Sequence, residues 1–65
     1  MKWTSENYPT EFEKFEPHIR SKLIEIANRL IAEEDYEEIT AVPAAITLAK
    51  KWAKEEGIEV KVMYE

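Results

Sequence analysis

The sequence contains no cysteine, one histidine and one glycine, and it has no long apolar run. The missing cysteines exclude a disulfide framework, a thiolate zinc site and a cysteine nucleophile. His18 alone is a poor basis for a transition-metal site. No segment approaches the length of a membrane span, and the opening MKWTSENYP lacks the apolar stretch of a signal peptide. We therefore expect a cytoplasmic protein with no membrane contact and no cofactor.

The chain has 65 residues, of which 45% are hydrophobic and 35% are charged. This composition is typical of a globular domain and argues against disorder. A chain of this size buries only ~60% of the surface that its unfolded form exposes, so its core is thin. Without disulfides or metals, regular helix packing or self-association must stabilise it. The net charge of −5 disfavours binding to nucleic acid, because phosphates repel an acidic surface.

Helical periodicity is strongest in residues 17–33, for which we predict a helix. Pro17 suits the first helical position, where its missing N–H costs nothing. One face of this helix is apolar: Ile19, Leu23, Ile26, Ala27, Leu30 and Ile31. We place the remaining polar side chains on the opposite, solvent-facing side: Arg20, Ser21, Glu25, Asn28 and Arg29.

A second helix is predicted over residues 41–55, antiparallel to the first. Thr40 would cap it, Pro43 would fall in its first turn, and Gly57 would supply a left-handed C-terminal cap. Its apolar stripe contains Val42, Ala45, Ile46, Ala49, Trp52 and Ala53. We interpret Trp52 as a core residue and the neighbouring lysines as a solvated face, not as a nucleic-acid site.

The segments outside the two long helices predict smaller elements. Residues 10–15 have the spacing of a short helix that lies across the other two, and residues 58–64 alternate as a strand does. A lone strand needs a partner, either the N-terminal MKWT or the same strand of a second molecule, which would give a homodimer. The expected fold is mainly α with a small β part. A single domain would contain a short helix, a two-helix hairpin and a two-stranded element from the termini.

Several short motifs can be compared with known families: Trp3-Thr4, Tyr8-Pro9, the run from Arg20 to Leu30, Tyr36-Glu37-Glu38, and Ala45-Ile46 through Ala49 to Trp52. Together they resemble a group of small bacterial proteins labelled ChaB-like or YdaT-like. The resemblance covers about residues 3–53 and implies a small helical domain without known catalytic residues, and the group carries the label of a cation transport regulator. Three positions depart from the group's pattern. Asp35 and Ile39 stand for glycines that flank its Tyr-x-Glu turn, and Pro43 interrupts its second helix.

Five carboxylates gather between the two long helices, and they form the one stretch that looks like a possible site. Carboxylate oxygens are the ligands that calcium and magnesium prefer, but this stretch lacks the ordered spacing and the central glycine of an EF-hand loop. We interpret it as a solvated turn, with divalent-cation binding as the alternative. The residues are Glu33, Glu34, Asp35, Glu37 and Glu38.

We expect no enzymatic activity. His18 and Ser21 lie near each other on one predicted helix, but catalysis needs a cleft that orients a base and a nucleophile, and so short a chain hardly forms one. Three aromatic residues, Trp3, Tyr8 and Tyr36, lie outside the helical stripes and either pack as a lid or face a partner.

Arg20 either binds the carbonyls at the end of the first short helix or pairs with the acidic turn. Together with the three aromatics it marks the possible partner surface. The predicted function is a non-catalytic binding or regulatory module that acts through contact with an unidentified protein. The alternative is a divalent-cation-responsive regulator that uses residues 33–38.

Overall fold

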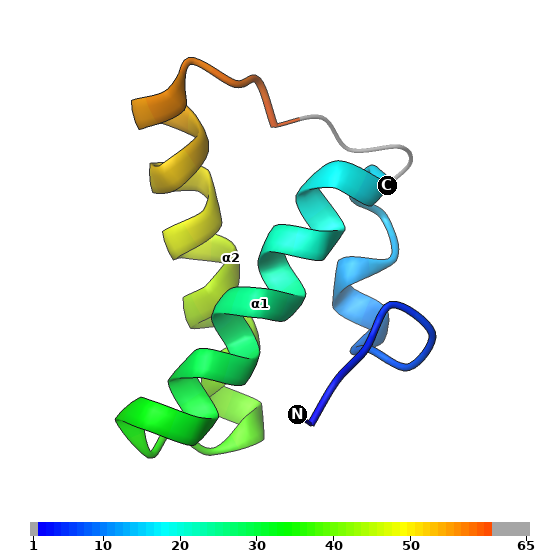
Figure 1. The fold of residues 1–65 in the computed structure, drawn as a ribbon, viewed down its shortest axis with the longest axis vertical. Helices are drawn as coiled ribbons and strands as arrows, with labels where there is room; N and C mark the ends of the chain where they lie inside the picture. Colours follow the sequence, from blue (N-terminus) through cyan, green and yellow to red (C-terminus); the bar gives the residue numbers. More distant parts are fainter. Residues whose placement is uncertain (1, 61–65) are drawn as a thin grey trace.

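Three helical segments follow one another in the structure, a computed structural model that describes residues 2–60. A turn of 3₁₀ helix, η1, spans Thr10–Phe12; α1 spans Pro17–Glu34 and α2 spans Glu38–Glu56. Figure 1 shows α1 and α2 side by side, joined by a short turn, with the N-terminal segment along the other side of α1. The chain is mainly helical and its two long helices pack in a hairpin-like way, as the sequence predicts.

Helix α1 begins at Pro17, the residue at which the sequence analysis places its start. Glu16 precedes it in an extended conformation, with φ −65° and ψ 156°, which is the backbone preferred before proline. Pro17 has no N–H, so its place at the first helical position leaves no additional donor unpaired. The helix continues one residue past the predicted end, to Glu34.

Helix α2 begins at Glu38, three residues before the predicted start, and Pro43 lies inside it. Thr40 is therefore a helical residue and not the N-cap. An internal proline removes one backbone hydrogen bond and disfavours a helical residue before it. Ala41 and Val42, which lie between Ile39 and Pro43 in this turn, are buried in the core, and their burial offsets the cost.

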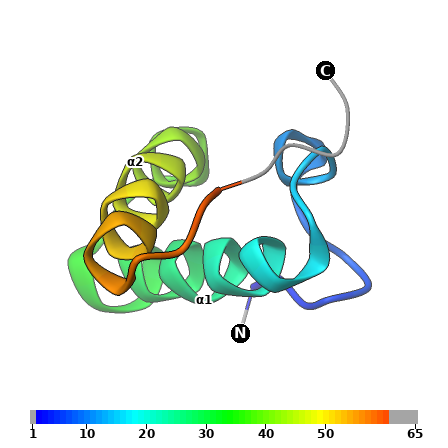
Figure 2. The ribbon, with the colours of Figure 1, turned by 90° about the horizontal axis from the view of Figure 1, so that it is seen from above.

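The first short helix is smaller than predicted: residues 13–15 do not continue η1 as an α-helix. Phe12 and Phe15 are nevertheless both buried in the core, together with Trp3 from further upstream. Seen from above in Figure 2, this N-terminal segment lies against one side of α1, and the segment after α2 runs back toward it. Ile58 and Val60 of that segment pack against the same core.

Small side chains fill the interface between α1 and α2. Because alanine adds little bulk, it lets two helix backbones approach closely. Larger apolar residues at the edges then exclude water from both sides of the contact. The fully or almost fully buried residues are Phe12, Ile19, Leu23, Ala27, Ala41, Ala45, Ala49 and Ala53.

The predicted two-stranded element is not found in residues 2–60. Thr4 instead pairs with Asn7 in a tight turn, through N–H···O distances of 2.9 and 3.2 Å. Both backbone groups of Trp3 are occupied by the side chain of Asn28, so they are not free to pair with another strand. Residues 58–60 do not form a strand, and residues 61–64 of the predicted strand lie outside the described residues.

Both long helices end in a left-handed residue. Gly57, with φ 72°, ends α2 in a Schellman motif, in which the N–H of Ile58 bonds to the carbonyl of Ala53 at 2.8 Å. Asp35, with φ 58°, ends α1 and is the one non-glycine residue with positive φ among those described. Glycine adopts this conformation without strain, whereas the side chain of Asp35 makes it less favourable. Ile39 stands at the other glycine position of the pattern, and it is an ordinary helical residue of α2.

We predict that Asp35→Gly stabilises the protein by about 0.5 kcal/mol. The substitution removes the strain of a left-handed backbone conformation, and it removes a carboxylate from the negative end of the α1 dipole. Both effects stabilise the folded state, and they exceed the opposing effect, which is the greater conformational freedom of glycine in the unfolded chain. Urea unfolding followed by circular dichroism measures the change. Asp35→Asn is the control, since it removes the charge and keeps the side chain. A glycine variant less stable than the wild type would contradict the prediction.

A pair of leucines tests where the core lies. Leu23 is 0% exposed and Leu48 is 41% exposed. We expect Leu23→Ala to lower the free energy of unfolding by about 3 kcal/mol, because it leaves a cavity in the core. Leu48→Ala should lower it by about 0.5 kcal/mol or less. Equal losses in urea unfolding would show that the core is not where the structure places it.

Candidate functional site

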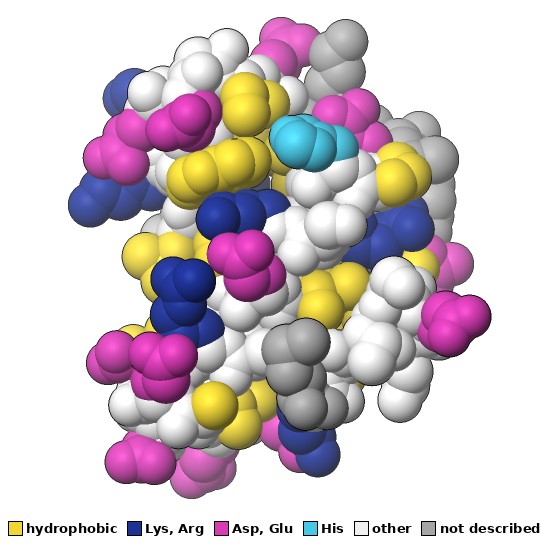
Figure 3. All heavy atoms as spheres, viewed as in Figure 1, with side chains coloured by type: hydrophobic (Ala, Val, Ile, Leu, Met, Phe, Trp, Pro, Cys, Tyr) yellow, Lys and Arg dark blue, Asp and Glu magenta, His cyan; other side chains and the backbone are white. Residues whose placement is uncertain are grey.

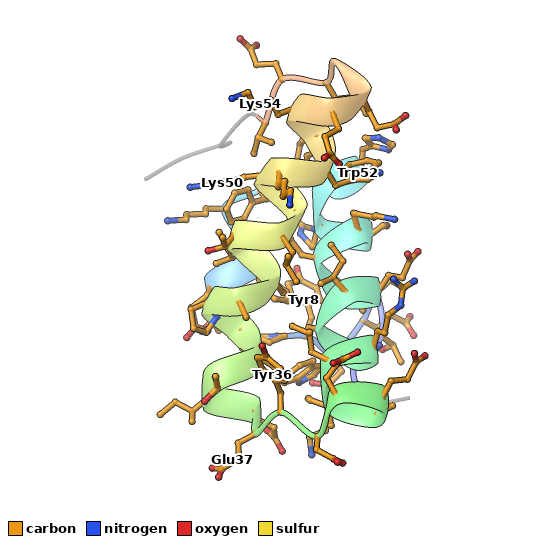
Figure 4. All side chains as sticks on the ribbon, turned by 90° about the vertical axis from the view of Figure 1, so that its left-hand side faces the viewer. Tyr8, Tyr36, Glu37, Lys50, Trp52 and Lys54 are labelled. Atoms are coloured by element: carbon orange, nitrogen blue, oxygen red, sulfur yellow. The ribbon has the colours of Figure 1, made fainter. Side chains whose placement is uncertain are left out.

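A groove runs between α1 and α2, on the face that the N-terminal segment leaves uncovered. Figure 4 shows this face, with Trp52 toward one end of the two helices and Tyr36 toward the other. The groove has a volume of about 470 Å³. We call it the interhelical groove. It is lined by Lys22, Ile26, Arg29, Leu30, Glu34, Tyr36, Leu48 and Trp52.

The floor of the interhelical groove is apolar, and an aromatic ring lies toward each of its ends. Ile26 and Leu30 on α1 are four residues apart, as are Leu48 and Trp52 on α2, so each pair lines one side of the groove. Ile26 and Leu30 are buried, whereas Leu48 is 41% exposed and Tyr36 is 38% exposed. These two exposed side chains, with the half-buried Trp52, give the groove an accessible apolar surface.

Trp52 lies at the rim of the core and not inside it, which corrects the sequence interpretation. The alanines bring α2 so close to α1 that an indole does not fit between the backbones, and Trp52 is half-buried at the edge of their interface. The Nζ of Lys22 lies 4.9 Å from the centroid of its ring, and the ring of His18 lies 6.1 Å from it. Figure 3 shows the histidine, in cyan, next to hydrophobic side chains and Lys or Arg side chains. The indole ring is thus in cation–π contact with Lys22.

Two cations on the α1 side of the groove share one carboxylate. Glu25 Oε1 lies 3.0 Å from Lys22 Nζ and 3.5 Å from Arg29 Nη2. Exposed pairs of this kind contribute little to stability, about 0.3–0.5 kcal/mol each. These ion pairs hold the side chains of Lys22 and Arg29 beside the groove. The single carboxylate of Glu25 neutralises only part of their combined positive charge.

The acidic turn does not form a metal site in the described residues. Its five carboxylate side chains are exposed, and one of them, Glu38, pairs with Lys2 at 2.7 Å. Within residues 2–60, no three His, Asp or Glu side chains gather closely enough to hold a metal ion. The residues Glu33, Glu34, Asp35, Glu37 and Glu38 therefore surround the Tyr36 end of the groove as separate charges.

Trp3 is 9% exposed and belongs to the core, so of the predicted partner-surface residues it is the one withdrawn from solvent. Asn28 holds it in place. Its Oδ1 accepts from the N–H of Trp3 and its Nδ2 donates to the carbonyl of Trp3, both at 2.9 Å. Sequence reasoning placed Asn28 on the solvent side of α1, and the structure shows it 6% exposed. The amide satisfies both backbone groups of a buried residue, as a neighbouring strand would do.

Arg20 joins the N-terminal segment to α1. Of the two roles that the sequence left open, it takes the first, in which it binds the carbonyls near the end of the first short helix. Its guanidinium donates to the carbonyls of Phe12, Glu13 and Phe15, at 3.4, 3.0 and 2.8 Å. The same group lies 5.2 Å from the centroid of the Tyr8 ring, which is half-buried. Of the four predicted partner-surface residues, Tyr36 is the one that lines the groove.

One curated protein shows clear similarity to this sequence: 43% of 54 aligned residues, which make up 83% of the chain, are identical. It is the uncharacterized protein YdaT of Bacillus subtilis (strain 168). The chain is similar to YdaT. It spans only about a third of YdaT, 35% of its length, so the likeness concerns one part of that protein. It agrees with the YdaT half of the resemblance seen in the sequence, while the ChaB half stays a prediction.

No family model and no solved structure matches the chain. Its likeness to YdaT brings no activity with it, so function must be argued from the groove. Neither α1 nor α2, nor any other helix among residues 2–60, combines the length and apolar character needed to cross a membrane.

We predict that Arg20→Lys lowers the free energy of unfolding by about 1–2 kcal/mol. A lysine keeps the charge, but its single ammonium cannot reach three carbonyls and also stack on Tyr8. Arg29→Lys is the matched control, because Arg29 is exposed and makes one ion pair at 3.5 Å. We expect a loss below about 0.5 kcal/mol for the control. Similar losses for the two variants in urea unfolding would contradict the role assigned to Arg20.

Proposed function

We propose that this chain is a non-catalytic binding module that acts through protein–protein contact, and that the interhelical groove is its contact surface. The observation that carries the proposal is the exposure of Leu48, Tyr36 and part of Trp52 around one groove. Aromatic and large apolar side chains grouped in this way are typical of the centres of protein interfaces.

The polar groups of the groove support binding more than chemistry. Lys22 and Arg29 are ion-paired at its side, and Glu34 lies near the acidic turn. General acid–base or nucleophilic catalysis needs a nucleophile and a base within hydrogen-bond reach. The eight residues that line the groove do not include such a pair. Charged groups around an apolar floor instead fit a surface that orients a partner.

The cation-responsive alternative receives no specific support. Binding of calcium or magnesium requires several oxygens to converge on one point. The carboxylates of residues 33–38 point outward from a short turn and do not converge in the described part of the chain.

Cross-linking from a single position tests this proposal. A photoreactive amino acid replaces Leu48 inside the groove, or Ile39 outside it, in the full chain within its host cells. Ile39 is 81% exposed and Leu48 only 41%, so random collision favours cross-links from Ile39, whereas a contact through the groove favours Leu48. We expect a discrete cross-linked product from position 48 and none from position 39. No product from position 48, or the same products from both, would overturn the proposal.

A further inference from the structure

We infer that residues 2–7 form a latch that opens and closes on α1 as a unit, while the rest of the domain stays folded. We call these residues the N-terminal latch. They lie on the other side of α1 from the interhelical groove, so this device is separate from the proposed contact surface. Three features indicate it: one buried side chain in the latch, backbone hydrogen bonds that stay inside it, and a cavity between it and α1.

The N-terminal latch buries one side chain. Trp3 is 9% exposed, whereas Lys2 and residues 4–7 are all exposed. The indole therefore supplies most of the apolar surface that the latch removes from water. The loss of conformational freedom along residues 2–7 opposes this gain, because each fixed residue adds to the entropic cost. The closed state is therefore favoured only modestly, as is typical of segments that open below the global unfolding transition.

The part of the N-terminal segment that follows the latch is held more firmly. Phe12 and Phe15 are 0% and 2% exposed, and Arg20 donates to the carbonyls of both. The half-buried ring of Tyr8 lies 5.2 Å from the same guanidinium. This part therefore belongs to the core, and the latch joins it between Asn7 and Tyr8.

The N-terminal latch is a preformed turn, because hydrogen bonds join its own residues to one another. Thr4 and Asn7 exchange two backbone bonds, of 2.9 and 3.2 Å. The hydroxyl oxygen of Thr4 also accepts from the N–H of Glu6 at 3.2 Å. All three bonds survive when the latch leaves α1, so the turn moves as one body.

Asn28 holds the latch closed. Its amide pairs with the N–H and the carbonyl of Trp3, at 2.9 Å each, where an unpaired buried backbone group would be costly. Lys2 adds an ion pair with Glu38, but both side chains are exposed, so this pair contributes little. The closed state therefore depends on the burial of one ring and on one amide of α1.

A cavity of about 340 Å³ lies between the latch and α1. Its walls include Thr4 and Ser5 of the latch, and Ser21 and Ile24 of the helix. Figures 1 and 2 show the same segment, in dark blue, as a loop that projects from the side of α1. The turn thus lies away from the helix, and few van der Waals contacts are lost when it opens. Opening uncovers Ile24, which is 8% exposed in the closed state.

Native-state hydrogen exchange, followed by NMR at low urea concentrations, tests the latch. The N–H of Trp3 bonds to a side chain outside the latch, so it exchanges when the latch opens. The N–H of Leu23, inside α1, exchanges on global unfolding. We expect Trp3 to be protected, but at least about tenfold less than Leu23, with a urea dependence of about a third or less. Equal protection and equal urea dependence would overturn the inference, and so would a Trp3 amide without protection.

Two variants distinguish the latch from the core. Asn28→Ala should abolish the protection of Trp3, and that of Leu23 should fall by no more than the factor that protects Trp3 in the wild type, since latch closure adds only its own equilibrium constant to stability. Arg20→Lys should lower the protection of Leu23 about five- to thirtyfold and leave Trp3 exchange within about twofold. A Trp3 amide that changes in step with Leu23 in both variants would overturn the inference. If Asn28→Ala fails to fold, the comparison of the two amides in the wild type decides.

Discussion

Two helices packed side by side form a layer with two faces, and each apolar face needs other side chains to exclude water from it. In this protein the alanines of α1 and α2 close the layer itself, and the N-terminal segment covers one face with Trp3, Phe12 and Phe15. The burial of those three aromatic rings is what turns two amphipathic helices into a domain. The N-terminal segment does not cover the opposite face of the α1–α2 layer, and the interhelical groove lies on that face.

The covering segment is held by contacts between side chains of α1 and backbone groups. Asn28 takes both backbone groups of Trp3, and Arg20 takes three carbonyls between Phe12 and Phe15. A segment with so little regular structure leaves many polar groups unpaired unless side chains satisfy them. These two residues of α1 therefore allow an irregular segment to lie against the core. Because the side chains of Asn28 and Arg20 satisfy these backbone groups, the N-terminal segment needs no neighbouring strand.

The sequence predicts those features that depend on local rules. Pro17 and Gly57 mark helix ends because their backbone preferences act within one turn. The apolar stripes of α1 and α2 follow from the helical period alone. The predicted start of α2 is wrong because the rule that places a proline in the first turn of a helix takes no account of the burial of Ala41 and Val42. That burial depends on tertiary contacts. Asn28 and Trp52 were misplaced for the same reason, since each depends on which element lies opposite it.

Leu48 shows where sequence reasoning missed the candidate site. It lies outside the apolar stripe recognised in α2, and only the packing of α1 places Ile26 and Leu30 next to it. Ile39 is more exposed than Leu48 but has no such neighbours in the groove, so exposure alone does not define a surface for binding. The distinguishing feature is an exposed apolar side chain beside a buried apolar floor. A contact there would remove the exposed part of Leu48 from water next to side chains that are already buried, which is the favourable step in forming an apolar interface.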